Sequence, residues 1–248
     1  MEFQNEVVVI TGGANGIGRA AALQAGREGA KVIVVDINEE QGHAVTDEVQ
    51  SLAGQAEFMP VDLTDVKQIG SLIAAIHKKY QHIDVLINCA GICRDTSVPD
   101  IKPEEWDLIM AINLKSVFFL CQEALKVMTP RKSGRIITIA SAAGKSGGVS
   151  AGAHYSASKA AIMCLTKTLA QYAAPHQIKV NCLCPGPVET DMTAGWSDEV
   201  TVAFKERIPL KRYASPQEAA DAILFLASDR AKYITGEILD LNGGLIMD

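Results

Sequence analysis

The chain has 248 residues, 48% of them hydrophobic, and a formal net charge of −6 at pH 7. This length and composition are enough to bury a sizeable core. The acidic balance argues against a nucleic-acid partner, because phosphate backbones are bound by clustered lysines and arginines. The first residues lack a signal-like pattern, and no apolar stretch looks long enough to cross a bilayer. We therefore expect a cytoplasmic protein that binds neither nucleic acid nor membrane.

The cysteines and histidines predict no metal site. Six cysteines in a chain this long, without a secretion signal, are expected to remain thiols. Cys182 and Cys184 face the same side of a predicted strand, which leaves metal binding open, but buried packing is favoured. His77 and His82 lie in a charged segment that is typical of a solvated helix end.

Short β-branched runs alternate along the chain with longer segments of helical periodicity, as in βαβ units around a parallel sheet. The first strand, Val7–Ile10, is continuously apolar, which suits a strand buried on both faces. A glycine-rich turn joins it to a helix from Ile17 to Glu28. The other expected strands are Lys31–Asp36, about Glu57–Val61, Val85–Asn88, Arg135–Ile139, Lys179–Cys184 and Glu237–Leu241. The other expected helices are about Glu39–Ala53, Asp65–Tyr80, Pro103–Met128 with or without a break, Tyr155–Ala173 and Pro216–Ala227.

No linker or low-complexity stretch interrupts this alternation. It predicts one α/β domain over residues 1–248, a doubly wound Rossmann fold whose parallel sheet has about seven strands with helices on both faces. Residues 186–209 are the exception, since they follow a strand end, are poorly periodic and contain Trp196. We expect a mobile flap over a pocket there, with a plain surface excursion as the alternative.

The turn TGGANGIG at residues 11–18 lies between the first strand and the first helix, where a dinucleotide fold holds pyrophosphate. Glycines let the backbone approach phosphate oxygens, and the helix N-terminus supplies free N–H groups and partial positive charge. An ordinary glycine turn is the alternative. The order of strand, glycines and helix favours the cofactor interpretation.

Two acids and a glycine stand at the ends of the next strands. Asp36 ends the second strand, where an acid accepts hydrogen bonds from the adenosine ribose, and its charge opposes a ribose 2′-phosphate. We therefore expect NAD rather than NADP. Asp62 is expected near the adenine amino group, and Gly91, in the turn at residues 88–91, near ribose or nicotinamide. Helix capping for either acid and a plain turn for Gly91 remain open.

Tyr155 and Lys159 stand four residues apart, so a helix places them on one face. The ammonium favours phenolate and is expected to lower the tyrosine pKa from its usual ~10, which suits general acid–base catalysis. Ser141, at the end of the fifth strand, can hydrogen-bond a substrate oxygen beside them. A nucleophilic serine is disfavoured, because no GxSxG turn surrounds Ser141, although His154 adjoins Tyr155.

These motifs together resemble the short-chain dehydrogenase/reductase family from Val7 to about Gly244. The resemblance implies a catalytic tetrad of Asn113, Ser141, Tyr155 and Lys159, in which Asn113 holds a water that passes protons to Lys159. It also implies that Lys159 binds ribose and that Val188 and Thr190 contact the nicotinamide carboxamide. The expected cofactor contacts are Gly12, Asn15, Gly16, Ile17, Gly18, Asp36, Asp62, Leu63, Asn88, Ala90, Gly91, Tyr155, Lys159, Pro185, Gly186, Val188 and Thr190.

Within the family, the segments at residues 90–95 and 235–244 are most similar to 3-oxoacyl-carrier-protein reductases. We therefore expect an NAD(H)-dependent oxidoreductase that interconverts a secondary alcohol and a ketone, with a 3-oxoacyl or 3-hydroxyacyl substrate. A polyol or sugar dehydrogenase is the alternative, because one fold serves many substrates. A non-catalytic NAD-sensing protein is a further one. The resemblance also implies a homotetramer with the 103–128 and 155–173 helices in one interface and residues 245–247 in another.

Overall fold

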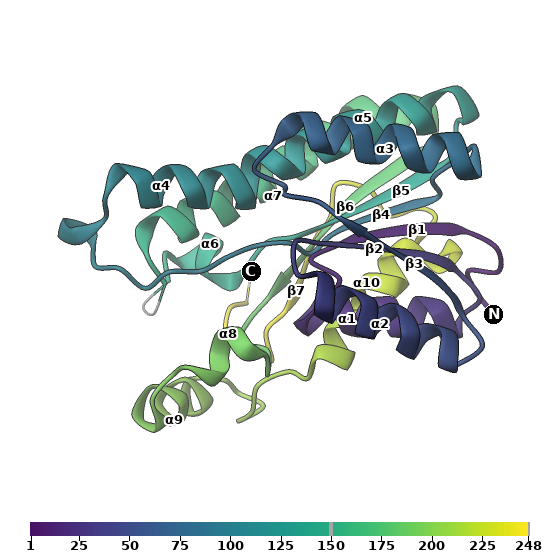
Figure 1. Ribbon diagram of the computed structural model, residues 1–248. Coiled ribbons are helices and arrows are strands. Elements are labelled where there is room, and N and C mark those ends of the chain that lie inside the picture. The colour runs from purple at the N-terminus through teal and green to yellow at the C-terminus, as the bar shows by residue number, and fades with distance from the viewer. Residues whose placement is uncertain (149–150, 248) are drawn as a thin grey trace.

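The computed structural model describes residues 1–148 and 151–247 of the chain. Its strands form one parallel sheet in the order β3-β2-β1-β4-β5-β6-β7 (Figure 1). This order confirms the predicted doubly wound fold. The third strand begins two residues earlier than expected. The strands are β1 Val7–Thr11, β2 Lys31–Asp36, β3 Gln55–Pro60, β4 Val85–Asn88, β5 Gly134–Ile139, β6 Ile178–Pro185 and β7 Ile238–Leu241.

Helices cover both faces of the sheet. In Figure 1, α3, α4, α5 and α7 lie above it, and α1, α2 and α10 lie below it. Helices α6, α8 and α9 lie toward one end of the strands, α6 beside α7 and the other two further below. The helices are α1 Gly16–Arg27, α2 Glu39–Ser51, α3 Val66–Tyr80, α4 Pro103–Met110, α5 Ser116–Arg131, α6 Ala142–Ser146, α7 Ala153–Ala173, α8 Asp191–Ala194, α9 Asp198–Arg207 and α10 Pro216–Ala227.

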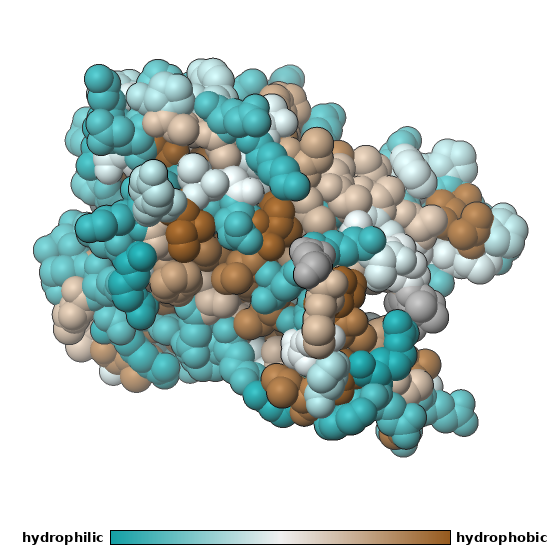
Figure 2. Space-filling view, turned by 180° about the vertical axis from the view of Figure 1, so that it is seen from behind, coloured by the Kyte–Doolittle hydropathy of each residue, from teal (hydrophilic) through white to brown (hydrophobic). Residues whose placement is uncertain are grey.

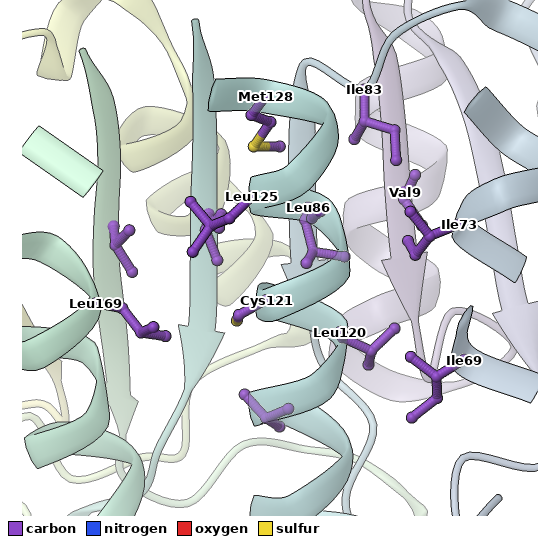
Figure 3. Close-up of a cluster of buried hydrophobic side chains, with 14 of the residues drawn as sticks. Val9, Ile69, Ile73, Ile83, Leu86, Leu120, Cys121, Leu125, Met128 and Leu169 are labelled. Atoms are coloured by element: carbon purple, nitrogen blue, oxygen red, sulfur yellow. The ribbon is translucent and has the colours of Figure 1, made fainter. Parts of the chain in front are cut away.

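Each face of the sheet has its own hydrophobic core. On one side, side chains of α3, α5 and α7 pack against β1, β4 and β5, and Leu86, Leu120 and Met128 are fully buried (Figure 3). On the other side, the alanine-rich face of α1 lies against α10 and the opposite side chains of the same strands. Burying a leucine or isoleucine fully stabilises the fold by about 1.5–3 kcal/mol. Strand residues that alternate between two cores explain the continuous apolar runs in the sequence.

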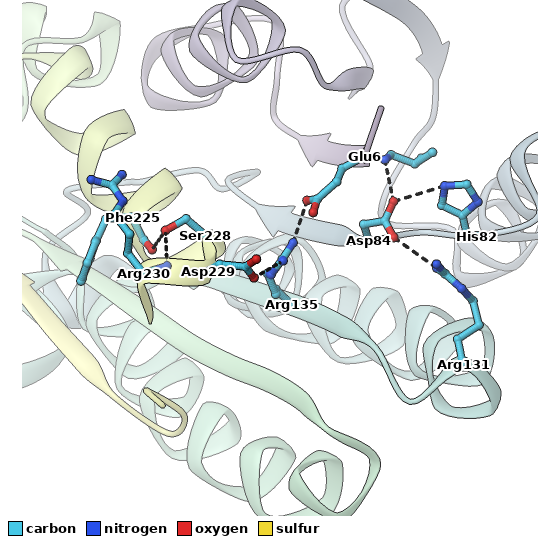
Figure 4. A network of polar contacts seen from close by, with 10 residues as sticks. Glu6, His82, Asp84, Arg131, Arg135, Phe225, Ser228, Asp229 and Arg230 are labelled. Carbon is cyan, nitrogen blue, oxygen red and sulfur yellow. Dashed lines mark hydrogen bonds and ion pairs between the residues drawn. The ribbon is translucent and has the colours of Figure 1, made fainter. Parts of the chain in front are cut away.

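Charged groups tie together the amino ends of the central strands (Figure 4). The Val7 amide donates to Asp84 Oδ2 at 2.8 Å, and Arg131 pairs with the other oxygen of Asp84 at 3.2 Å. Arg135 pairs with Glu6 at 2.6 Å and with Asp229 at 2.7 Å. These contacts join neighbouring segments at the edge of the sheet opposite the carboxyl ends of the strands.

The predicted helix at 103–128 does contain a break. α4 and α5 are joined by a π-helical turn at Ala111–Lys115, which inserts a wider turn into an otherwise continuous helical stretch. By length and composition alone, Pro103–Arg131 could cross a membrane, so the expectation that no stretch is long enough was wrong. The α5 part of this stretch packs on the sheet, where Leu120, Ala124 and Met128 are fully buried.

Candidate active site

A cavity of about 660 Å³ opens at the carboxyl edge of the sheet. It lies by β1 and β4, the neighbouring strands at which the strand order reverses its direction. This is the switch point at which doubly wound sheets bind ligands, and the volume is typical of ligand sites. Figure 2 shows the surface hollowed between the part carrying α8 and α9 and the rest of the molecule, with hydrophobic residues exposed in the hollow. The cavity runs along the glycine turn, the ends of β2 to β6, α7 and the 186–209 segment.

The glycine turn fits a closely approaching dinucleotide. Gly12 and Gly16 have φ of +64° and +53°, in the left-handed region that favours glycine. A Cβ on Gly12 would lie 2.6 Å from the Ala90 nitrogen, so the turn packs directly on the chain after β4. Asn15 caps α1 by accepting from the Gly16 amide, and the N–H groups of the first helical turn have no intrahelical partner. This arrangement suits pyrophosphate.

Gly18→Ala is expected to weaken NADH binding at least ~10-fold and to lower Tm by about 3–10 °C. A Cβ at Gly18 would lie 2.1 Å from the Gly12 carbonyl oxygen, so the turn must shift. Fluorescence titration with NADH and thermal unfolding measure the two effects. Gly70→Ala is the matched control, because nothing lies within 4 Å of its Cβ position and alanine favours helix by about 1 kcal/mol. Equal NADH affinity in both variants would contradict the assignment of the turn.

Asp36 and Asp62 both line the cavity. Asp36 accepts from the amides of Ala14 at 3.2 Å and Asn38 at 3.1 Å, while Asn38 itself caps α2. Asp62 accepts from the amide and hydroxyl of Thr64, and these bonds lower its pKa. Asp65, rather than Asp62, caps α3. Neither acid is therefore the N-cap of the next helix, and both lie in the wall of the cavity.

Ser141, Tyr155 and Lys159 converge in the same cavity. Ser141 begins α6 as its N-cap, and Tyr155 lies in the first turn of α7. The two helices touch closely, since a Cβ on Gly144 would lie 2.7 Å from the Ala160 nitrogen. The Ser141 side chain acts on the phenol directly, since it lowers the pKa of Tyr155. The close contact of α6 and α7 thus fixes the serine beside the phenol.

Lys159 is almost fully buried and donates from Nζ to the Ile139 carbonyl oxygen at 2.9 Å. Its Nζ lies 5.7 Å from the centroid of the Tyr155 ring. Burial lowers the pKa of Lys159. The ammonium is therefore held by the end of β5 at one side of the tyrosine, with its remaining donors free to meet a ligand.

The pKa of Tyr155 differs from the expectation. Burial raises it, nearby Cys93 raises it further, and the Ser141 side chain acts in the opposite direction. The predicted lowering by Lys159 is not found, because loss of hydration is the largest cause of the shift and Lys159 is not among the groups that shift the pKa of Tyr155. The phenol therefore holds its proton and can act as a proton donor.

Asn113 lies in the π-helical turn and is fully buried. Its amide accepts from the Ile92 N–H at 2.9 Å, and it donates to the Ile92 carbonyl and to Ser158 Oγ. It does not line the cavity, but it stands next to it at Gly91. The position of a Cβ on Gly91 would be 3.3 Å from Lys159 Nζ and 3.4 Å from Asn113 Oδ1. The missing side chain leaves space between the amide and the ammonium.

The cavity wall includes every predicted cofactor contact except Asn88. Asn88 is buried and donates to the Cys121 sulfur at 3.5 Å, and its Oδ1 has no hydrogen-bond partner among the described residues. Alternation along β4 directs this side chain into the core beneath the site. Other wall residues were not predicted and come mainly from the chain after Ser141, the 186–209 segment and the C-terminus: Ile37, Val61, Cys89, Ile92, Cys93, Ile112, Ile139, Ala140, Ala142, Ala143, Ser146, Gly148, Ala151, Pro187, Asp191, Met192, Thr193, Trp196, Phe204, Arg207, Leu245 and Ile246.

Two cysteines in the wall are poor nucleophiles. Burial raises the pKa of Cys89 to about 12 and that of Cys93 to about 11. Both thiols stay protonated near neutral pH, and the thiolate is the nucleophilic form. All six cysteines are free, and the described residues contain no group of three His, Cys, Asp or Glu that could hold a metal.

His154, which adjoins Tyr155 in sequence and was considered as a base for Ser141, contacts α4 instead. Its ring is fully buried, and Nε2 lies 2.7 Å from Glu105 Oε1 on α4. Trp106 stacks on the ring with the centroids 6.4 Å apart. This contact binds the first turn of α7, which carries Tyr155, to α4. Nothing in the sequence pairs positions 105 and 154.

Comparisons with known proteins agree with this geometry. The family model described as "Enoyl-(Acyl carrier protein) reductase" matches residues 12–246. The 3-oxoacyl-(acyl-carrier-protein) reductase FabG of Thermotoga maritima is 38% identical over 247 residues, covering all of both chains. A solved 3-oxoacyl-(acyl-carrier protein) reductase from Brucella melitensis has a TM-score of 0.94 at 32% identity, over 100% of this chain and 93% of that one. A Brucella melitensis protein titled short-chain dehydrogenase/reductase SDR: glucose/ribitol dehydrogenase has a TM-score of 0.92 at 32% identity, over 100% and 99%.

The family model spans nearly the whole chain, and the full-length relative exceeds 30% identity. The glycine turn and the Ser141, Tyr155 and Lys159 cluster occupy one cavity at the switch point of the sheet. The chain therefore belongs to the short-chain dehydrogenase/reductase family, whose members are oxidoreductases that act on hydroxyl or keto groups with a nicotinamide dinucleotide.

Proposed function

We propose that this protein is an NAD(H)-dependent reductase of 3-oxoacyl compounds, which it interconverts with 3-hydroxyacyl compounds. The main support for this proposal is that Ser141 and Tyr155 line the same cavity as the glycine turn. The name of the Thermotoga maritima relative supports the 3-oxoacyl substrate. The fit of the cavity to small molecules and the acidic surface agree with a cytoplasmic enzyme of soluble substrates.

The bound nicotinamide supplies the hydride, and the protein has four tasks around it. Ser141 Oγ and Tyr155 Oη hold the substrate oxygen between them. In the reducing direction, Tyr155 Oη gives its proton to the oxygen as negative charge develops there. Lys159 Nζ stabilises the phenolate that remains and binds ribose hydroxyls. Asn113 Oδ1 and Lys159 Nζ both lie beside Gly91, and we assign to them the water that returns a proton to the tyrosine.

The cofactor preference rests on charge. Asp36 lies in the cavity wall, where Lys159 and Arg207 are the basic residues among those described. Neither belongs to the adenosine end, which is made by the glycine turn and the ends of β2 and β3. A ribose 2′-phosphate beside Asp36 would therefore meet a like charge without a compensating base. This supports NAD over NADP.

Asp36→Asn tests the preference. The unaltered protein is expected to prefer NADH to NADPH at least ~10-fold in kcat/KM, and the variant to lose most of that ratio, because a neutral amide does not repel phosphate. Initial rates with each cofactor and one 3-oxoacyl thioester provide the measurement. Asp62→Asn is the control and should change both cofactors alike. An unaltered protein that uses NADPH as well as NADH would overturn the preference.

The substrate class is tested by following nicotinamide absorbance with a 3-oxoacyl thioester, an enoyl thioester of equal length and a polyol. Turnover of the 3-oxoacyl compound above the others supports the proposal. A polyol or sugar dehydrogenase is the second candidate, because the Brucella melitensis structure titled glucose/ribitol dehydrogenase covers the whole chain. Cofactor binding without turnover of any alcohol or ketone would instead indicate a sensing protein.

We also propose a homotetramer. The exposed apolar side chains of α4, α5 and α7 support it, since Trp106 and Leu108 are each 41% exposed and Tyr172 is 61% exposed. We propose likewise that residues 186–209 form a flap over the substrate. They fold into α8 and α9, and Asn15 Nδ2 donates to Asp191 Oδ2 at 2.5 Å, which links the flap to the glycine turn.

A further inference from the structure

One end of the cavity has apolar walls and a single guanidinium. The flap and the C-terminal segment form these walls with Met192, Trp196, Phe204, Leu245 and Ile246. Arg207, in the last turn of α9, lines the same end. An apolar site with one cation is suited to a ligand that has an apolar body and an anionic group.

Arg207 has no acidic partner within 4 Å among the described residues. Its guanidinium carbon lies 5.6 Å from the centroid of the Phe204 ring. The other cation of the wall, Lys159, bonds to the Ile139 carbonyl beside the tyrosine. The carboxylate of Asp191 is bonded to Asn15 at the glycine turn. The guanidinium donors of Arg207 are thus available to a ligand in the cavity.

Aromatic packing fixes the part of α9 from which Arg207 projects. Trp196 stacks on Phe204 with the centroids 5.1 Å apart, and its edge meets Tyr213 at 6.0 Å. The neighbouring Lys205 lies over the Tyr213 ring instead, with Nζ 5.2 Å from its centroid, and does not line the cavity. Two cations two residues apart on one helix therefore have different surroundings.

We propose that Arg207 is a specificity-determining residue that binds an anionic group of the acyl substrate. The group is either the carboxylate of a free 3-oxo acid or a phosphate of a phosphopantetheine-type thioester. A guanidinium binds either one through two parallel hydrogen bonds. Because the chain carries a net charge of −6, an anion needs a local cation to approach this cavity. The assignment rests on the proposed 3-oxoacyl reductase function.

The test compares three substrates with NADH: a free 3-oxo acid, the corresponding coenzyme A thioester and the uncharged N-acetylcysteamine thioester. Arg207→Gln is expected to lower kcat/KM for an anionic substrate about 10-fold more than for the uncharged thioester, mainly through KM. Arg207→Lys should recover part of the loss, and 0.5 M salt should reduce the difference. Lys205→Gln should leave the ratio between substrates unaltered.

The free acid and the coenzyme A thioester distinguish the two sources of the anion. In Arg207→Gln, kcat/KM should fall more for the substrate whose anionic group Arg207 binds. An equal change for all three substrates in Arg207→Gln, or the same loss in Lys205→Gln, would overturn the role of Arg207. Either result is compatible with the proposed reductase function, provided that the unaltered protein reduces the uncharged thioester. Failure to reduce any of the three would overturn the function itself, and the subsite with it.

Discussion

Tyr155→Phe is expected to lower kcat/KM for ketone reduction by about 10²- to 10⁴-fold, the range that a general acid supplies. The phenol is buried and its pKa is raised, so it stays protonated, and removing its oxygen takes away the proton donor. Phenylalanine fills the same space in the wall. The affinity for NADH should therefore change much less than the rate, and Tm should change little.

Initial rates and NADH titration measure the two effects. Tyr172→Phe, at an exposed position of the same helix, is the matched control and should keep full activity. Because burial raises the pKa of Tyr155, the reduction rate under kcat/KM conditions should not fall from deprotonation of this phenol at neutral pH. Equal rates for Tyr155→Phe and the unaltered protein would exclude the phenol as the acid.

Lys159→Met is expected to damage both functions of the ammonium. The rate should fall by about 10²-fold or more because no cation remains to stabilise the phenolate, and the Kd for NADH should rise about 10-fold because a charged donor to ribose is lost. Methionine keeps most of the aliphatic volume of this buried side chain. Loss of the bond to the Ile139 carbonyl also costs about 1–3 kcal/mol of stability.

Single-turnover rates and NADH titration separate the two functions. Lys167→Met removes an exposed lysine two turns later on α7 and should alter neither quantity. An unaltered Kd for NADH in Lys159→Met would remove the ribose role, while an unaltered rate would remove the catalytic one.

Local sequence patterns were sufficient to predict the fold and to place Ser141, Tyr155 and Lys159 in one cavity. The apolar runs of β1 and β4, the turn at 11–18 and the spacing of Tyr155 and Lys159 each depend on residues within one or two turns of chain. The carboxyl ends of parallel strands meet at one edge, so knowing the strands also brings Asp36, Asp62 and Ser141 together. Their arrangement follows from short-range geometry and one topological rule.

Other features depend on contacts between distant segments. The π-helical turn at Asn113 departs from the 3.6-residue period, so periodicity could not orient that side chain. The protonated state of Tyr155 depends on how completely the residues packed around it from other segments, Cys93 among them, exclude water. The pairing of Glu105 with His154 and the place of Arg207 in the wall both require the tertiary structure, because neither belongs to a local pattern.

The two cores on opposite faces of the sheet give the cofactor a mechanical role. The glycine turn leads into α1, which packs on one face, while Tyr155 and Lys159 belong to α7, which packs on the other. A dinucleotide in the cavity would join these layers as a brace across the edge of the sheet. A substitution that loosens the packing of either helical layer would then weaken dinucleotide binding, even far from the cavity. A bound dinucleotide would in turn slow the local unfolding of both layers.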